Sequence, residues 1–230
     1  LLAGTLVGQQ APQKNWKPGE YELYQAAFGE KDLNAKIKKL DEWREKFKES
    51  DYADVRTGLL IDAYQKLNRP EDVMRLGNEV ITANPKDLRT VYTMATTVLG
   101  IPSPSGDATA AGEKAGHVLA ENPDSLKPAG VAEAEWAKTK PTLEALGHTV
   151  LGKLAMLRKD NETAEKEFTA SLQVHGDNSQ VSYWLGTVNR AQKSIEKQSS
   201  ALYHFARAAA FEGQGALNEQ GRKEMLAYLE

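Results

Sequence analysis

The best candidate for chemistry in this chain is a carboxylate and an imidazole four residues apart. Glu144 and His148 would share one face of a helix, a spacing that can bring both side chains to a single metal ion. Zinc requires three or four ligands, and no second His or Cys lies at a matching spacing. We therefore expect a surface hydrogen bond or a packing contact between helices, with a metal or small-ligand pocket as the alternative.

Other residue types that carry out catalysis do not form a recognisable motif. His117 and His204 fall inside apolar helical patterns, and His175 precedes a glycine at the expected end of a helix. The pair Gly213 and Gly215 lacks the lysine and the preceding strand of a phosphate-binding loop. The chain has no cysteine, which excludes disulfides and thiolate chemistry. We predict no catalytic residues, no metal site and no cofactor.

The composition is that of a folded chain without a surface for nucleic acid. Of the 230 residues, 40% are hydrophobic and 27% charged, with a formal net charge of -3. Such a balance offers no basic surface large enough to neutralise many phosphates, so we do not expect nucleic acid as a partner. The tryptophans are far apart in the sequence, and we expect each to pack in a core or between helices: Trp16, Trp43, Trp136 and Trp184.

The opening residues predict export. Leu1–Gly8 lacks an initiator Met and resembles the end of the apolar region of a secretory signal peptide, followed by a Gln- and Pro-containing cleavage zone. We expect residues 1–19 to be a signal-peptide remnant or a disordered tail. The mature protein is then periplasmic or secreted, with the cytoplasm as the alternative. The apolar segment is far shorter than the roughly 20 residues that span a bilayer, so no membrane span is expected.

Apolar residues at three- and four-residue spacing predict a series of helices. We expect helices over residues 21–28, 34–48, 55–67, 70–83, 87–99, 109–120, 131–138, 141–159, 162–174, 179–192, 198–211 and 218–229. Two prolines between Asn122 and Gly130 make that segment the best candidate for a joint between two halves.

We expect the chain to divide into N-terminal repeats, a linker and C-terminal repeats. Residues 20–125 would form divergent helical repeats, and residues 126–140 a linker with an extra helix. Residues 141–230 would form the best-matched repeats and a capping helix, with Met225, Leu226 and Leu229 pointing inward.

Two stretches of the chain repeat each other. Each has a Leu-Gly pair followed by an Ala-x-x-x-Phe motif: Leu151-Gly152 with Ala164 and Phe168, then Leu185-Gly186 with Ala201 and Phe205. The two glycines lie 34 residues apart (186 minus 152). Small residues let two helix backbones approach closely, while we expect the phenylalanines to fill the space against the next unit. The pattern predicts paired helices that recur along the chain.

This period and these residue types resemble the tetratricopeptide repeat (TPR), a pair of antiparallel helices that stacks on its neighbours. Weaker copies begin at Asp54 and Leu88, with Pro85 and Pro123 where a second helix ends, although no copy carries the family's tryptophan. The resemblance implies an all-α fold, a right-handed α-α superhelix or TPR-like solenoid, in a divergent bacterial member of the family. It would contain about five helix pairs and a C-terminal capping helix.

The resemblance also implies where a partner would bind. TPR ligands lie along the concave face, at set positions of each unit's first helix, and these positions here give seven candidates: Asp62, Lys66, Arg89, Tyr92, Lys153, Tyr183 and Arg190. Two tyrosines, two arginines and two lysines among them would suit an acidic or extended peptide. Family members that grip a C-terminal carboxylate carry Asn at the ninth position, and no unit of this chain has it.

The leading hypothesis is a non-catalytic protein-protein interaction scaffold that binds a peptide or protein on the concave face. One alternative is a structural envelope component that self-assembles through an uncapped end. Another is a small-ligand or metal binder in an inter-helix pocket near Glu144 and His148. The identity of the partner and the oligomeric state stay open.

Overall fold

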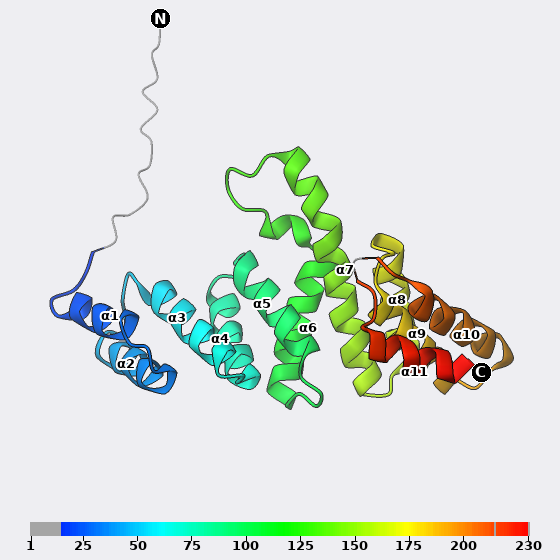
Figure 1. Ribbon diagram of the computed structural model, residues 1–230. Helices are drawn as coiled ribbons and strands as arrows, with labels where there is room; N and C mark the ends of the chain where they lie inside the picture. Colours follow the sequence, from blue (N-terminus) through cyan, green and yellow to red (C-terminus); the bar gives the residue numbers. More distant parts are fainter. Residues whose placement is uncertain (1–14, 214, 230) are drawn as a thin grey trace, which may run out of the picture. The chain divides into compact units, whose positions relative to one another are not determined.

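The computed structural model describes residues 15–213 and 215–229, which form α-helices and contain no β-strand (Figure 1). The helices are α1 (Glu20–Phe28), α2 (Leu33–Lys46), α3 (Ala53–Lys66), α4 (Pro70–Ala83), α5 (Leu88–Leu99), α6 (Gly106–Glu121), the 3-10 helix η1 (Pro123–Leu126), α7 (Glu133–Leu157), α8 (Asn161–Val174), α9 (Ser179–Ala191), α10 (Ile195–Ala210) and α11 (Glu219–Leu229). The predicted all-α fold is confirmed. Within these ranges no helix is both long enough and apolar enough to cross a bilayer. The expected leader at residues 1–8 lies outside the described residues.

Short polar side chains begin many of these helices. Seven of them accept a hydrogen bond from the backbone N–H three residues further on: Asp32, Asp87, Ser105, Asp160, Asn178, Ser194 and Asn218. Each bond satisfies an N–H group that has no partner inside its helix. Lys159 and Lys193, which follow α7 and α9, have φ angles of 63° and 59°. Both residues reverse the chain between paired helices, so the turn recurs with the repeat.

The chain forms two compact units, one up to Arg69 and one from Pro70 onward. In the first unit α1 packs on α2, and α2 packs on α3. The boundary expected at residue 125 instead falls inside the second unit, where η1 contacts both α6 and α7. The repeat that begins at Asp54 is divided, because α3 belongs to the first unit and α4 to the second.

The second unit is a succession of packed helices. From α4 to α11 each helix packs on the next, and α4 also contacts α6, α5 contacts α7, and α7 contacts α9. Contacts with the next helix and the next but one are those of stacked helical hairpins. The predicted helical-repeat architecture is therefore confirmed within this unit.

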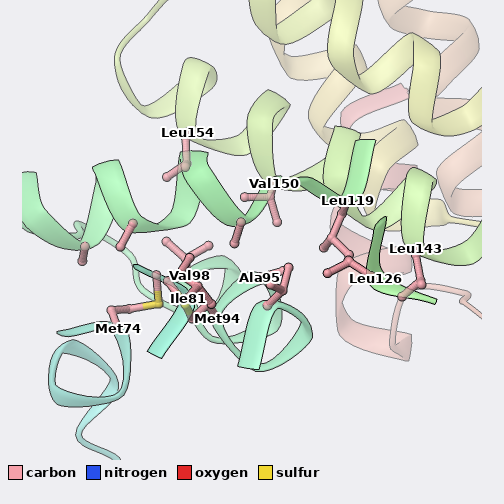
Figure 2. Packing of buried hydrophobic residues seen from close by; sticks show 14 of the residues in the cluster. Met74, Ile81, Met94, Ala95, Val98, Leu119, Leu126, Leu143, Val150 and Leu154 are labelled. Carbon is pink, nitrogen blue, oxygen red and sulfur yellow. The ribbon is translucent and has the colours of Figure 1, made fainter. Parts of the chain in front are cut away.

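An apolar core runs through α4, α5, α6 and α7 (Figure 2). Its side chains are almost fully buried and include Met74, Ile81, Met94, Val98, Leu119, Leu126, Val150 and Leu154. A second buried cluster around Phe168, Val181 and Leu185 joins α7, α8 and α9. The apolar face of each hairpin is thus buried against its neighbours, as a solenoid requires.

Glycines set the closest crossings within the two best-matched hairpins. A Cβ built on Gly152 would lie 2.6 Å from the ring of Phe168, and one on Gly186 would lie 2.7 Å from the ring of Phe205. The expectation for the phenylalanines needs a correction, because each ring packs against the glycine of its own hairpin. Phe168 also reaches the next hairpin through Trp184, with ring centroids 5.7 Å apart.

A single helix, α7, replaces the two helices expected over 131–138 and 141–159. Pro141 lies inside it, although proline removes one backbone hydrogen bond from a helix. Trp136 is buried, and its Nε1 donates to Asp124 Oδ1 over 2.9 Å, while Lys140 Nζ donates to Oδ2 of the same carboxylate over 2.5 Å. These contacts hold the start of α7 against η1, so the expected linker at 126–140 is a folded part of the second unit.

The expected capping helix is present as α11, which packs on α10. Of the three side chains expected to point inward, Met225 lines a pocket against α9, whereas Leu226 is exposed. The side chain of Leu229 lies outside the described part of the structure.

Candidate functional site

The first helices of three successive hairpins, α5, α7 and α9, lie in contact in that order. Five of the predicted binding residues lie on them at repeat positions that share one helical side: Arg89, Tyr92, Lys153, Tyr183 and Arg190. Arg89, Tyr92 and Arg190 are exposed, and Lys153 and Tyr183 are half-buried. We call these five residues, with Leu157 beside them, the first-helix face.

Large apolar groups are exposed on this face. The side chain of Tyr92 on α5 is 46% exposed, and that of Leu157 on α7 is 37% exposed. Tyr183 on α9 packs on Phe205, with ring centroids 6.1 Å apart. Exposed aromatic and aliphatic side chains on a rigid helical support are the usual anchors of protein interfaces.

The stretches of helix that form this face carry basic residues and no acidic ones, whereas Glu133, Glu135 and Glu144 lie earlier on α7. Helices α5 and α9, together with residues 145–157 of α7, contain Arg89, Lys153 and Arg190 but no Asp or Glu. The second helices α6 and α8 instead carry six acidic residues: Asp107, Glu113, Glu121, Glu162, Glu165 and Glu167. A chain with a net charge of -3 therefore keeps acids away from its first-helix face.

Lys153 holds a half-buried ammonium group on this face. Its Nζ lies 4.8 Å from the centre of the Trp184 ring on α9, within cation-π distance. Burial lowers the pKa of Lys153, because the charged form loses hydration. Among the residues that the structure describes, no carboxylate lies within ion-pair distance of this ammonium group. The group is placed to receive an anion.

A pocket of about 410 Å³ adjoins the face at α9. Its walls come from α9 and from α11 with the loop before it: Gln180, Tyr183, Ala216, Leu217, Asn218, Gln220, Gly221 and Met225. The backbone N–H of Ser179 donates to the carbonyl of Gly215 over 3.1 Å and holds this loop. Gly215 has a φ of 94°, and a Cβ there would lie 2.4 Å from the carbonyl oxygen of Asp177, so the turn needs glycine.

Asp62 and Lys66, the remaining predicted binding residues, lie on α3 in the first unit. Asp62 Oδ2 and Lys66 Nζ form an ion pair of 2.8 Å across one helical turn, and both side chains are largely exposed. An exposed pair of this kind stabilises a helix by about 0.3–0.5 kcal/mol. Five of the seven predicted residues therefore belong to the second unit, and this pair belongs to the first.

His148 contacts a residue other than the predicted Glu144. Its Nδ1 lies 2.8 Å from Glu167 Oε2 on α8, and both side chains are mostly buried. This contact joins the two helices of one hairpin. In the described ranges, no group of three or more His, Cys, Asp or Glu residues is arranged to hold a metal ion.

An aromatic cluster in the first unit was missed from the sequence. Trp16 stacks on Tyr52 with ring centroids 3.6 Å apart and planes 7° from parallel. The Trp16 ring also lies 5.2 Å from Tyr24 and 6.0 Å from Trp43, so two tryptophans that are far apart in the sequence pack together. The spacing of Tyr21, Tyr24 and Phe28 along α1 was the available signal, because it places three rings on one helical side.

Glu20 is fully buried beside this aromatic cluster. Trp43 Nε1 donates to Glu20 Oε1 over 2.8 Å, the Ser50 hydroxyl donates to the same oxygen, and the Lys17 N–H donates to Oε2 over 3.1 Å. Burial by itself raises the pKa of a carboxyl group, but the bonds from Ser50, Trp43 and Lys17 outweigh it, so the pKa of Glu20 is lowered. The carboxylate ties the start of α1 to the end of α2 as a structural element.

Comparison with known proteins adds one similar structure. No protein-family model matches the chain, and no curated protein matches it. A thermophilic TPR protein of Thermus thermophilus, known from a crystal structure, is similar over 91% of this chain and 95% of its own. The two share 13% sequence identity, with a TM-score of 0.43.

Proposed function

We propose that this chain is a non-catalytic scaffold that binds a protein or peptide partner on the first-helix face of its second unit. The observation that carries the proposal is the row of exposed or half-buried aromatic and basic side chains on the adjacent helices α5, α7 and α9. A partner that crosses successive hairpins meets equivalent positions once per repeat, which lets weak contacts add along its length.

The engagement of the histidines supports a scaffold over an enzyme. His148 contacts Glu167 across a hairpin, and His117 Nδ1 lies 2.8 Å from Glu121 Oε1 on the same helix. His204 is half-buried within α10. General acid-base catalysis needs such a ring within reach of a substrate, whereas His148 and His117 are each engaged by a neighbouring carboxylate.

We place the scaffold in the periplasm or outside the cell of a bacterium, with the cytoplasm as the alternative. The apolar residues Leu1–Gly8 support this proposal, together with the polar segment that follows them. Fractionation of source cells with an antibody against the chain tests it. Recovery in the cytoplasmic fraction would favour the alternative.

Site-specific photocrosslinking in source cells tests the proposed binding face. We expect a photoreactive residue in place of Tyr92 to join the chain to a partner protein. The matched control places the same residue at Lys166, which is exposed on the second helix α8. A product formed equally from both positions, or unaffected by Leu157→Ser, would contradict the proposal.

Self-assembly is a second candidate function because α10 exposes three large apolar side chains: Ile195, Leu202 and Tyr203. The side chain of Ile195 is 86% exposed. Exposed apolar groups that lie together on one helix favour association between copies. Light scattering over a concentration series measures this directly, and a strict monomer removes the candidate.

A further inference from the structure

We infer that the partner segment is acidic and extended, and that Lys153 binds one of its carboxylates beside the Trp184 ring. This inference rests on the proposed function, since it names the chemistry of the partner that the first-helix face accepts. Two observations carry it: α5, α9 and residues 145–157 of α7 contain basic residues and no Asp or Glu, and Lys153 has no anionic partner among the described residues.

The charge pattern decides the sign of the partner. A basic segment laid on the first-helix face would meet Arg89, Lys153 and Arg190 without one carboxylate on the same stretches of helix. Like charges brought together at an interface disfavour binding, whereas opposite charges favour both encounter and register. An acidic segment is therefore the complementary one.

Lys153 differs from several partly buried cations in the second unit, which form ion pairs or hydrogen bonds. Lys140 pairs with Asp124 and Lys197 with Glu165, and Arg207 donates to the Ser182 hydroxyl and the Gly176 carbonyl. Lys153 is also half-buried, yet the contact that its ammonium group makes is with the Trp184 ring. Removing a charge from water without a paired counter-charge is unfavourable, so a carboxylate supplied by a partner would gain most at this position.

Exposed Tyr92 and Leu157 define the second requirement of the partner. They offer apolar contact on the helices that flank and contain Lys153, so the partner should carry apolar side chains on the same side as its acidic ones, which in an extended segment means two residues apart. Packed helices are about 8–10 Å apart, and an extended chain advances about 3.3 Å per residue. A segment that crosses α5, α7 and α9 therefore needs roughly six residues.

The test uses a synthetic peptide of about eight residues in which pairs of Asp alternate with pairs of Leu, so that each side of the extended peptide carries both residue types. It is blocked at both ends so that it has no terminal carboxylate. Binding to the full chain is followed by fluorescence anisotropy of a dye on the peptide. We expect the Asp/Leu peptide to bind about tenfold or more tightly than the matching Asn/Leu peptide, and to weaken as salt is raised. A Lys/Leu peptide should not bind.

Substitutions then test whether Lys153 binds a carboxylate of the peptide. We expect Lys153→Met, which keeps the apolar stem and removes the charge, to weaken binding of the Asp/Leu peptide about tenfold. Lys153→Arg retains a cation and should keep most of the affinity, which guards against a simple folding defect in the Met variant. Lys166→Met on α8 removes the same charge from another surface and should leave binding unchanged.

Two results would overturn this inference. One is equal weakening by Lys153→Met and Lys166→Met, which indicates attraction by net charge alone. The other is an Asn/Leu peptide that binds as tightly as the Asp/Leu peptide. If Tyr92 crosslinks a partner while the Asp/Leu peptide fails to bind, the proposed scaffold stands and only its acidic specificity is lost. If neither experiment succeeds, both proposals fail.

Discussion

Glu20 is a single buried residue on which the first hairpin depends. Carboxylates are almost never fully buried unless hydrogen bonds replace the lost water. Here three donors from Lys17, Trp43 and Ser50 do so, and they come from segments before α1 and from the end of α2 and beyond. The same contacts place Trp43 beside the Trp16 ring, so the aromatic cluster and the buried charge form one structure.

Replacing Glu20 by Gln should destabilise the first unit. An amide keeps the shape of the carboxylate but turns one acceptor into a donor, which then faces another donor. Leaving a buried partner unsatisfied costs about 1–3 kcal/mol in free energy of unfolding. Urea unfolding followed by tryptophan fluorescence measures the change, and Glu22→Gln on the exposed side of α1 is the control.

The pH dependence of the free energy of unfolding gives a second comparison between the wild type and Glu20→Gln. Because the folded-state pKa of Glu20 is lowered, its stabilising contribution is present above the unfolded pKa of about 4.3 and is lost as the pH falls through the folded value. The gap in stability between wild type and Glu20→Gln should therefore shrink on acidification. A gap that stays constant below pH of about 4 would show that the ionised form of Glu20 is unimportant.

At the scale of helices, close crossings depend on a glycine facing a large ring. Gly152 and Gly186 each lie against a buried phenylalanine, one repeat apart, so the crossing geometry recurs with the sequence. Packing of this density tolerates little added volume, because the ring on the other side is itself enclosed.

Gly152→Ala should therefore lower stability, although alanine favours a helix more than glycine does. The new methyl group would lie 2.6 Å from the fully buried ring of Phe168, and overpacking of this kind costs about 1–3 kcal/mol. Thermal unfolding followed by circular dichroism measures this loss of stability. Gly106→Ala is the control, since a Cβ there meets nothing within 4 Å.

A double substitution sharpens this test. Adding Phe168→Leu to Gly152→Ala gives the new methyl group room, so the combined loss should be smaller than the sum of the two single losses. Additive losses would show that the close contact between Gly152 and Phe168 does not determine the cost.

At the scale of the whole molecule, the chain divides into two compact units that each have buried side chains of their own. We expect Glu20→Gln to lower the transition of the first unit and Gly152→Ala to lower that of the second. Calorimetry on the full chain should resolve the two unfolding transitions, because two-state behaviour is expected of single domains and not of multidomain chains. One shared transition that both substitutions shift equally would contradict this prediction.

Local pattern alone was sufficient to predict most of the helices and the repeat. Pro70 to Ala83 is predicted with the same ends that α4 has, and the Gly-Phe pairs of two hairpins follow from a period in the sequence. Helical spacing, capping residues and turn residues act over a few positions, which is why they can be recognised from the sequence alone. Five of the predicted binding residues share a face for the same reason, since they occupy equivalent positions in successive repeats.

Tertiary contacts decided what local pattern could not. Pro141 predicts a break, yet burial of Trp136 and the bonds to Asp124 keep α7 continuous across it. Trp16 meets Tyr52 only because the first unit folds them together, and Lys153 faces a ring instead of a carboxylate because of what α9 places beside it. Each of these outcomes depends on residues far apart in the chain, whose pairing has no periodic signature and is set by which apolar surfaces bury one another.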